Sequence, residues 1–238
     1  MKLDILAIAA HPDDIELACS GTLASHRAQG YKVGILDLTQ GEMGTRGTPE
    51  IRLQESDDSS KILGLNAREN LGFKDIYFKD DLAHQEAIAK VIRKYQPEIV
   101  LANAIRDRHP DHGKGGNLAS HACFISGLRK LDTEIDGVAQ EPWRPKFVYH
   151  YIQNEYIEPD LVVDVSDYWE IKKNSILAFK SQFHNPDSKE PESFISSPEF
   201  LDFIEARSRE LGHKINVKYG EGFTVERVAG VKNLFDLI

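Results

Sequence analysis

Short apolar runs alternate with longer segments of helical periodicity along most of the chain. Five runs have the length and composition of buried strands, at residues 3–9, 32–38, 98–103, 146–152 and 161–165. A more weakly patterned stretch at 66–78 is expected to hold a short strand around 69–71, which makes the run at 98–103 the fourth strand. Segments with helical periodicity and terminating residues at their ends span 15–29, 50–63, 83–95, 114–131, 167–180 and 198–211. This alternation predicts an α/β fold that is Rossmann-like, with a mainly parallel sheet and helices on both faces. The length of 238 residues suits a single domain over 1–238.

The segments between these elements differ in character. Residues 39–49 form a glycine-rich loop that is longer than a structural connection requires. Residues 132–144 are expected to be a surface connection. Residues 184–197 are polar and carry two prolines, so we expect a mobile flap or a contact between subunits. The tail beyond Lys214 is predicted to hold a strand pair that turns at residues 220–222.

Two histidine motifs follow predicted strands. The first strand leads into residues 11–14, His-Pro-Asp-Asp, and the strand at 98–103 leads into residues 109–112, His-Pro-Asp-His. In a common doubly wound order the first and fourth strands are neighbours, and ligands bind where their carboxyl ends diverge. We therefore expect the two motifs to meet in one site.

The first motif favours a metal site over a nucleotide site. A dinucleotide fold would carry a glycine fingerprint after the first strand, whereas Pro12, Asp13 and Asp14 stand there. Two carboxylates and an imidazole packed into one turn need a positive partner. Both groups are ligands for zinc, so a divalent metal is the expected partner.

Composition narrows the classes of function. The net charge of −9 argues against binding to nucleic acid, because no basic face would neutralise phosphates. The apolar runs are too short to span a membrane, and the first run contains Asp4, which does not suit a signal peptide. The two cysteines, Cys19 and Cys123, have no ligand-like spacing and suit a reducing compartment. The sequence therefore predicts a cytoplasmic protein with no nucleic-acid or membrane partner.

Three motifs carry a family resemblance. Ala-His-Pro-Asp-Asp at 10–14, His-Pro-Asp-His at 109–112 and the loop at 41–47 together resemble the LmbE-like (PIG-L) family of zinc-dependent N-deacetylases. The resemblance implies a hydrolase that removes the acetyl group from an N-acetylglucosamine derivative. The 41–47 loop followed by Arg52 is most similar to deacetylases of bacillithiol biosynthesis, which implies N-acetylglucosaminyl malate as the substrate.

The resemblance also implies roles for the motif residues. His11, Asp14 and His112 would hold Zn²⁺, with a position left open for water, as in catalytic zinc sites. Asp13 would be the general base for that water. The spacing alone does not rank His109 against His112 as a ligand; only the family pattern separates them.

The remaining candidates surround this centre. His109 would stabilise the oxyanion or protonate the leaving amine, with Asp111 orienting it. Arg46, Arg52 and Arg108 lie in or beside the predicted site loops of an acidic chain. Since guanidinium groups bind carboxylates in a planar fork, we expect these arginines to bind a small sugar conjugate that carries carboxylates.

Alternatives stay open at this stage. A non-catalytic, metal-stabilised binding module would use four protein ligands. A non-heme iron oxygenase also uses two histidines and one carboxylate, although such enzymes usually have a β-barrel fold. Within the deacetylases, the substrate could be a chito-oligosaccharide or a mycothiol precursor, and the metal could be Fe²⁺ or another divalent ion. The family resemblance further implies a homo-oligomer, either a trimer or a hexamer.

Overall fold

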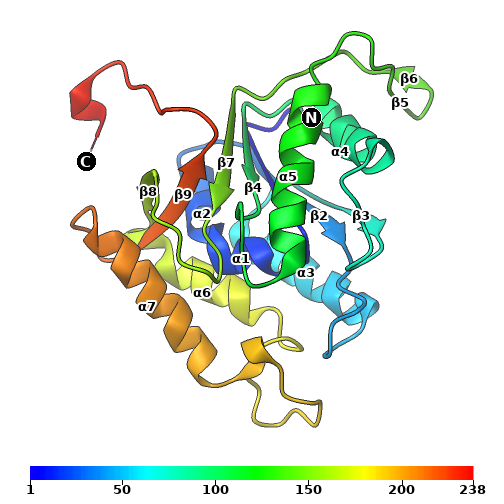
Figure 1. Cartoon of the computed structure of the whole chain (residues 1–238). Helices are drawn as coiled ribbons and strands as arrows, with labels where there is room; N and C mark the ends of the chain where they lie inside the picture. Colours follow the sequence, from blue (N-terminus) through cyan, green and yellow to red (C-terminus); the bar gives the residue numbers. More distant parts are fainter. Residues whose placement is uncertain (238) are drawn as a thin grey trace.

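A seven-stranded sheet forms the centre of the molecule (Figure 1). This computed structural model describes residues 1–237. The strands are β1 (Ile5–Ala9), β2 (Val33–Thr39), β3 (Ala67–Phe73), β4 (Ile99–Ala102), β7 (Phe147–Tyr151), β8 (Leu161–Asp164) and β9 (Gly220–Val225). Their order is β3-β2-β1-β4-β7-β9-β8. All neighbouring pairs are parallel except the two that β9 makes, so the sheet is mainly parallel as predicted.

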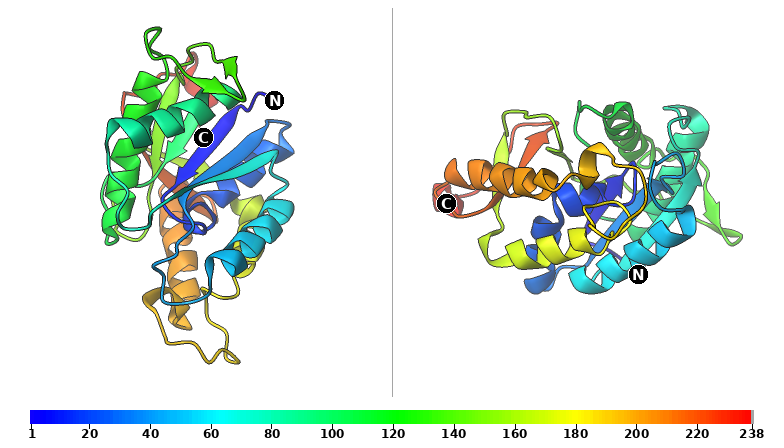
Figure 2. Two further views of the ribbon diagram at one scale, coloured as in Figure 1. Left: turned by 90° about the vertical axis from the view of Figure 1, so that its right-hand side faces the viewer. Right: turned by 90° about the horizontal axis from the view of Figure 1, so that it is seen from below.

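Helices cover both faces of this sheet (Figure 2). They are α1 (Asp14–Ala18), α2 (Ser20–Ala28), α3 (Pro49–Leu63), α4 (Leu82–Tyr95), α5 (Pro110–Ile125), α6 (Trp169–Leu177) and α7 (Glu199–His213). Alternate residues of β1 separate the two faces. Leu6 and Ile8 pack in one apolar core with α4 and α5, whereas Ile5 and Ala7 pack in another with α1, α2 and the end of α3. The predicted α/β class with helices on both faces is confirmed.

The strand order brings the two histidine motifs together. β1 lies between β2 and β4 and is parallel to both, with Ile5 opposite Val33 and Ile99. The carboxyl ends of β1 and β4 are therefore adjacent, as predicted. The chain leaves β1 toward α1 and leaves β4 toward α5, so both motifs lie at the same edge of the sheet.

The first helical segment is not the single helix expected over 15–29. It breaks at Cys19 into α1 and α2, because a buried carboxylate takes up the first amides of α2. Glu221 of β9 accepts hydrogen bonds from the Gly21 amide at 3.0 Å and the Thr22 amide at 2.6 Å. The same carboxylate pairs with Lys172 of α6 at 2.6 Å. Nothing local in the sequence signals this break, because Glu221 lies two hundred positions away.

Two other boundaries differ from expectation. α5 begins at Pro110 and ends at Ile125 instead of spanning 114–131, since Pro110 suits the first turn and the His109 ring accepts a hydrogen bond from the Asp111 amide at 3.3 Å. The predicted turn at 220–222 is also wrong. These residues lie inside β9, whose residues 220–223 pair with β8.

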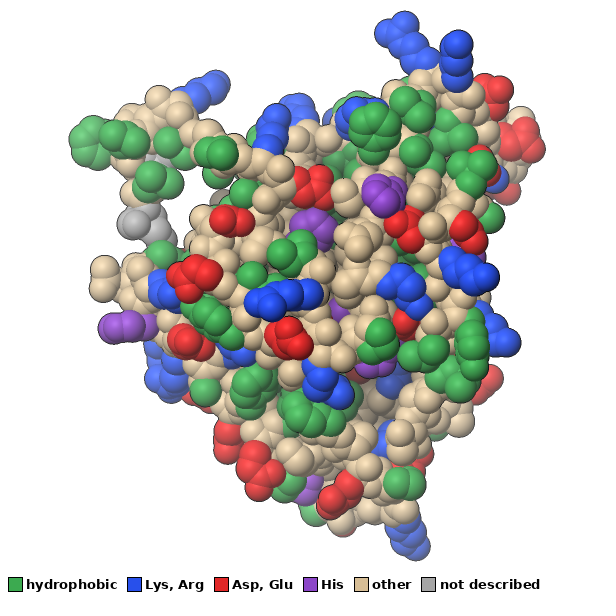
Figure 3. Space-filling view, viewed as in Figure 1, with side chains coloured by type: hydrophobic (Ala, Val, Ile, Leu, Met, Phe, Trp, Pro, Cys, Tyr) green, Lys and Arg blue, Asp and Glu red, His purple; other side chains and the backbone are tan. Residues whose placement is uncertain are grey.

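Two surface segments stand apart from the main sheet: an unpredicted hairpin within 132–144, and the chain that follows β9. The 132–144 connection contains a short hairpin of β5 (Glu134–Ile135) and β6 (Val138–Ala139). Beyond β9 the chain extends away from the domain and exposes apolar side chains, including Val228 (Figure 3). Of the helices within residues 1–237, none is both long and apolar enough to cross a bilayer. The predicted homo-oligomer stays a prediction.

Replacing Lys172 with alanine is expected to lower the free energy of unfolding by about 3–5 kcal/mol. Lys172 and Glu221 are 1% and 2% exposed, so the substitution leaves an unpaired carboxylate in the core. Chemical denaturation measures the change. The neighbouring, exposed Lys173 offers a matched control, and its alanine variant should stay within about 0.5 kcal/mol of the wild type. Equal stability of the two variants would contradict the importance of this ion pair.

Candidate active site

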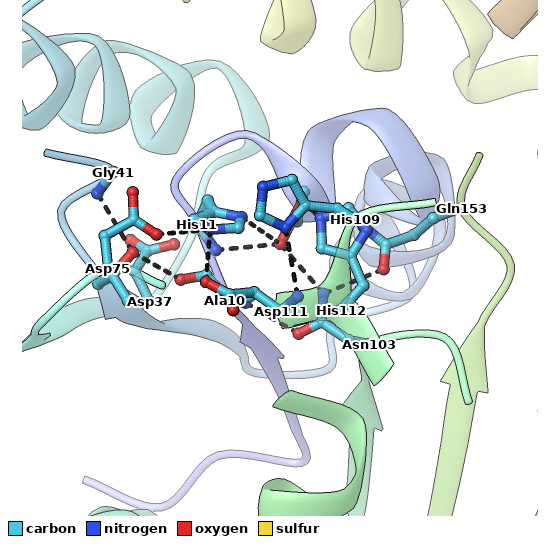
Figure 4. Close-up of polar contacts among 12 residues, drawn as sticks. Ala10, His11, Asp37, Gly41, Asp75, Asn103, His109, Asp111, His112 and Gln153 are labelled. Atoms are coloured by element: carbon cyan, nitrogen blue, oxygen red, sulfur yellow. Dashed lines mark hydrogen bonds and ion pairs between the residues drawn. The ribbon is translucent and has the colours of Figure 1, made fainter. Parts of the chain in front are cut away.

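A cavity of about 300 Å³ opens at the carboxyl edge of β1 and β4. Its walls come from both histidine motifs, from the glycine-rich loop after β2 and from the segment before α7. Of the side chains predicted to carry the chemistry, all but Asp111 line it, together with residues that were not predicted: His11, Asp13, Asp14, Arg46, Arg52, Asp75, Ile76, Arg108, His109, His112, Gln182 and Phe194. Figure 4 shows how part of this set converges.

Asp14 is held from several directions at the start of α1. Its Oδ2 accepts hydrogen bonds from the His11 amide and from Asn103 Nδ2, both at 3.0 Å. Its Oδ1 accepts one from Gln153 Nε2 at 3.0 Å and lies 3.0 Å from His112 Nε2. Donors that follow β1, β4 and β7 therefore fix one carboxylate. Asn103 and Gln153 were not predicted, since single amides carry no motif.

Carboxylates also fix the rings of the two histidines. Asp107 Oδ2 lies 2.5 Å from His112 Nδ1, and Asp75 Oδ1 lies 3.0 Å from His11 Nε2. Asp111 Oδ2 is 3.4 Å from the same His11 nitrogen. Each carboxylate holds a hydrogen on the ring nitrogen that it contacts, His11 Nε2 or His112 Nδ1. The other ring nitrogen, His11 Nδ1 or His112 Nε2, faces Asp14. Asp107 lies beside a recognised motif, whereas Asp75 lies in the weakly patterned stretch after β3.

The charges around Asp14 fit a bound cation. Burial alone would lower the pKa of His11, but hydrogen bonds to Asp111 and Asp75 and the charge of Asp14 raise it to about 10. Burial alone would also lower the pKa of His112, but the charge of Asp14 and hydrogen bonds to Asp107 and Asp14 raise it to about 9. The site thus stabilises positive charge strongly. Imidazole nitrogen and carboxylate oxygen are donors that suit zinc and other divalent metals.

The structure brings the three predicted metal ligands together, but His109 lies close enough to be a ligand as well. His11 Nδ1 and His112 Nε2 lie 3.7 Å and 3.0 Å from the Asp14 carboxylate. One ring nitrogen each of His11, His109 and His112 also lie within 4.8 Å of one another, so His109 is close enough to ligate. The assignment of His11, Asp14 and His112 as ligands stays a prediction.

Asp13 occupies a strained backbone position between these groups. Its φ is 109°, in the left-handed region that non-glycine residues rarely adopt. Within residues 1–237 its side chain forms no capping hydrogen bond to α1, and it lines the cavity. Burial raises the pKa of Asp13 to about 7, with the positive charge of Arg52 opposing and the charge of Asp14 adding. A carboxyl group of this pKa suits a proton acceptor at neutral pH.

His109 and Asp111 are arranged differently from the expected pair. His109 lines the cavity, and its Nδ1 accepts the backbone N–H of Asp111, which leaves Nε2 to carry a hydrogen. The Asp111 carboxylate does not orient that ring. It lies against His11 instead, accepts the Ile76 amide at 2.9 Å and pairs with Lys114 at 2.7 Å. The motif spacing could not reveal this, because His11 follows β1 and Ile76 lies in the loop after β3.

The three predicted arginines have different surroundings. Arg46 is buried, and its Nε donates to the carbonyl of Ser181 at 2.8 Å, so it fixes the chain that covers the cavity. Arg52 donates to Gln182, and its buried Nε has no partner within residues 1–237. Its guanidinium lies so close to Gly41 that a side chain there would overlap it. Arg108 is exposed and stacks on the ring of Phe194, with its Cζ 4.2 Å from the ring centre.

The 184–197 segment lies over one side of the cavity. Residues 193–195 line the cavity directly. Glu190 accepts the Gly47 amide at 3.0 Å, which ties the segment to the glycine-rich loop. The structure therefore places this segment at the site, while its predicted movement stays a prediction.

Comparison with known proteins agrees with this geometry. The family model of PIG-L, described as GlcNAc-PI de-N-acetylase, matches residues 6–123, which include both histidine motifs. A diacetylchitobiose deacetylase of Thermococcus kodakarensis is 31% identical over 75% of this chain and 70% of its own. The chain belongs to the PIG-L deacetylase family. The conserved protein TT1542 of Thermus thermophilus has the same fold, with a TM-score of 0.87, 37% identity and 98% of each chain covered.

More distant relatives differ in their substrates. A probable N-acetyl-α-D-glucosaminyl L-malate deacetylase 2 of Bacillus subtilis is 27% identical over 76% of this chain and 84% of its own. A 4-oxalmesaconate hydratase of Pseudomonas putida is 26% identical over 75% of this chain and 74% of its own. The family is therefore clear, while the substrate must be argued from the site.

Replacing His112 with alanine should abolish most of the stabilisation that added zinc gives. A ligand at about 1,000 times its Kd raises the free energy of unfolding by about 4 kcal/mol. The rise is measured as the difference between zinc-loaded and chelator-treated samples of each variant, because the substitution also perturbs the metal-free protein. His121, exposed on the same helix, serves as control, and His121→Ala should keep the full rise. A full rise in the His112 variant would exclude it as a ligand.

Proposed function

We propose that the protein is a zinc-dependent N-deacetylase of an N-acetylglucosamine conjugate. The observation that carries this proposal is the relation of Asp13 to the cluster beside it. A buried carboxyl group with a pKa near neutrality faces the cavity, next to two histidines and one carboxylate that are oriented by further groups. This is the arrangement that hydrolysis of an unreactive amide requires: a site for a cation, and a base that is not itself tied up.

The residues divide the reaction among them. A divalent cation, when bound, polarises the acetyl carbonyl and lowers the pKa of a water molecule toward neutrality. Asp13 accepts the proton of the attacking water. His109 donates a hydrogen bond from Nε2 to the oxygen that gains negative charge, because its Nδ1 already accepts the Asp111 amide. The proton then passes from Asp13 to the sugar nitrogen, and acetate and a free amine leave.

The arginines favour a substrate with carboxylates, of which N-acetylglucosaminyl L-malate is our choice. The guanidinium of Arg108 has no ion pair within residues 1–237 and lies at the cavity wall beside Phe194. Arg52 presents a buried Nε without a partner in the same part of the chain. These two groups can take the carboxylates of a malyl group, whereas the Nε of Arg46 donates to the carbonyl of Ser181. The malate deacetylase among the relatives supports the same substrate.

Release of acetate from three substrates tests the proposal. Zinc-loaded protein is incubated with N-acetylglucosaminyl L-malate, diacetylchitobiose and free N-acetylglucosamine, and free amine and acetate are measured. A strong preference for the malate conjugate supports the full proposal. Equal or better turnover of the neutral sugars would keep the deacetylase and remove the malate substrate. No acetate from any of the three, with zinc confirmed bound, would favour a binding module or a different reaction such as hydration.

Asp13→Asn should lower kcat for deacetylation by about 10²- to 10⁴-fold, because the amide cannot accept the proton of water. Asparagine also tolerates positive φ, so the backbone should be preserved. Zinc binding and the unfolding midpoint are measured beside the rate and should stay close to wild type. A variant that keeps its kcat would show that another group is the base.

Arg108→Ala should raise KM for the malate conjugate by about 10- to 100-fold, the value of one or two charge-assisted hydrogen bonds. KM for diacetylchitobiose should stay within about twofold. Arg106 is exposed in the same loop and does not line the cavity, so Arg106→Ala is the matched control. A parallel loss on both substrates would contradict a role for Arg108 in recognising carboxylates.

A further inference from the structure

Ile76 has a backbone conformation that is unfavourable for its residue type. Its φ is 66°, and a β-branched side chain in the left-handed region is a steric outlier. Burial does not offset this strain well, because the side chain is 40% exposed at the mouth of the cavity. Strain of this kind persists only where the surroundings hold the backbone in place.

Two side chains of α5 hold the backbone of Ile76 from both sides. Asp111 Oδ2 accepts its N–H at 2.9 Å, and Lys114 Nζ donates to its carbonyl oxygen at 2.7 Å. Lys114 also pairs with Asp111 at 2.7 Å, so the two groups act as one clamp. The second histidine motif thus fixes the turn after β3.

The residue before this clamped position contacts the first histidine motif. Asp75 Oδ1 lies 3.0 Å from His11 Nε2, and its Oδ2 accepts the Met43 amide at 3.2 Å. Its own amide donates to Glu42 Oε1 at 2.7 Å. Asp75 is 4% exposed, and Figure 4 shows it beside the His11 ring. It thus connects the end of β1 to the glycine-rich loop.

We propose that Asp75 is a positioning residue for His11, and that the clamp on Ile76 keeps Asp75 in contact with the ring. The carboxylate holds a hydrogen on His11 Nε2 and leaves Nδ1 directed toward Asp14. Without the clamp, the strained turn relaxes and withdraws the carboxylate. This inference rests on the proposed function, because it assumes that His11 holds the metal.

The test is the zinc affinity of the purified protein, measured by competition with a chromogenic chelator. Asp75→Asn should weaken zinc binding by about 10- to 100-fold, as loss of a carboxylate partner of a ligating histidine does. Lys114→Ala should weaken it by a smaller factor. The double variant should bind zinc no more weakly than Asp75→Asn, because Lys114 acts through Asp75. Tyr77, exposed in the same turn, gives the control variant Tyr77→Ala, which should bind like the wild type.

A rescue experiment separates positioning from general destabilisation. Glycine adopts positive φ without strain, so adding Ile76→Gly to Lys114→Ala should restore most of the lost zinc affinity. Thermal unfolding of the metal-free variants is recorded in parallel, and a merely structural role would lower the midpoint without this rescue. Additive losses in the double variant, or unchanged affinity in Asp75→Asn, would overturn the inference.

Failure of the proposed deacetylase function and failure of the positioning role give different results. If the wild type binds zinc but releases no acetate, deacetylation fails, while a weakened Asp75→Asn variant still supports the positioning role. If the wild type is an active deacetylase and Asp75→Asn binds zinc normally, the positioning role fails alone. Absence of zinc binding by the wild type would overturn both.

Discussion

The carboxylate of Asp14 is the point on which the site depends. A buried negative charge is costly unless donors and opposite charges surround it, and here the chain supplies both from elements far apart in the sequence. Its neighbours come from the ends of β1, β4 and β7 and from the first turn of α5. Satisfying this one group therefore requires the central strands to be in their final order. The chemistry at the cavity and the order of the sheet are parts of the same constraint.

Around Asp14, the rings of His11 and His112 each lie between two carboxylates. The histidines face Asp14 with one ring nitrogen each and face a second carboxylate with the other. Asp13 differs, because its side chain lines the cavity and makes no capping hydrogen bond to α1 within residues 1–237. The two adjacent aspartates thus have different surroundings. One is held by donors on all sides, and the other lies where it can exchange a proton.

The sequence predicted those features that depend on a short local pattern. It did not predict those that depend on contacts between residues far apart in the chain. The period of the apolar residues gave the α/β class and the neighbouring of β1 and β4, and two compact motifs located the site. The break at Cys19, the role of Asp75 and the direction of Asp111 depend on single long-range contacts. No local pattern marks such partners. The sequence does not identify the substrate either, because it does not distinguish the three arginines, whereas the structure gives each of them different contacts.

The last strand has a consequence for how the protein is made. β9 lies between β7 and β8, and its Glu221 caps the helix that continues from α1. Asp13 and Asp14 leave the ribosome among the first residues, but β9, which completes the sheet, is synthesised almost last. Domains fold as units once their contacts can form, so a nascent chain of this protein stays without a finished site for most of translation. The sheet and the cavity at its carboxyl edge are thereby finished only when the chain is nearly complete.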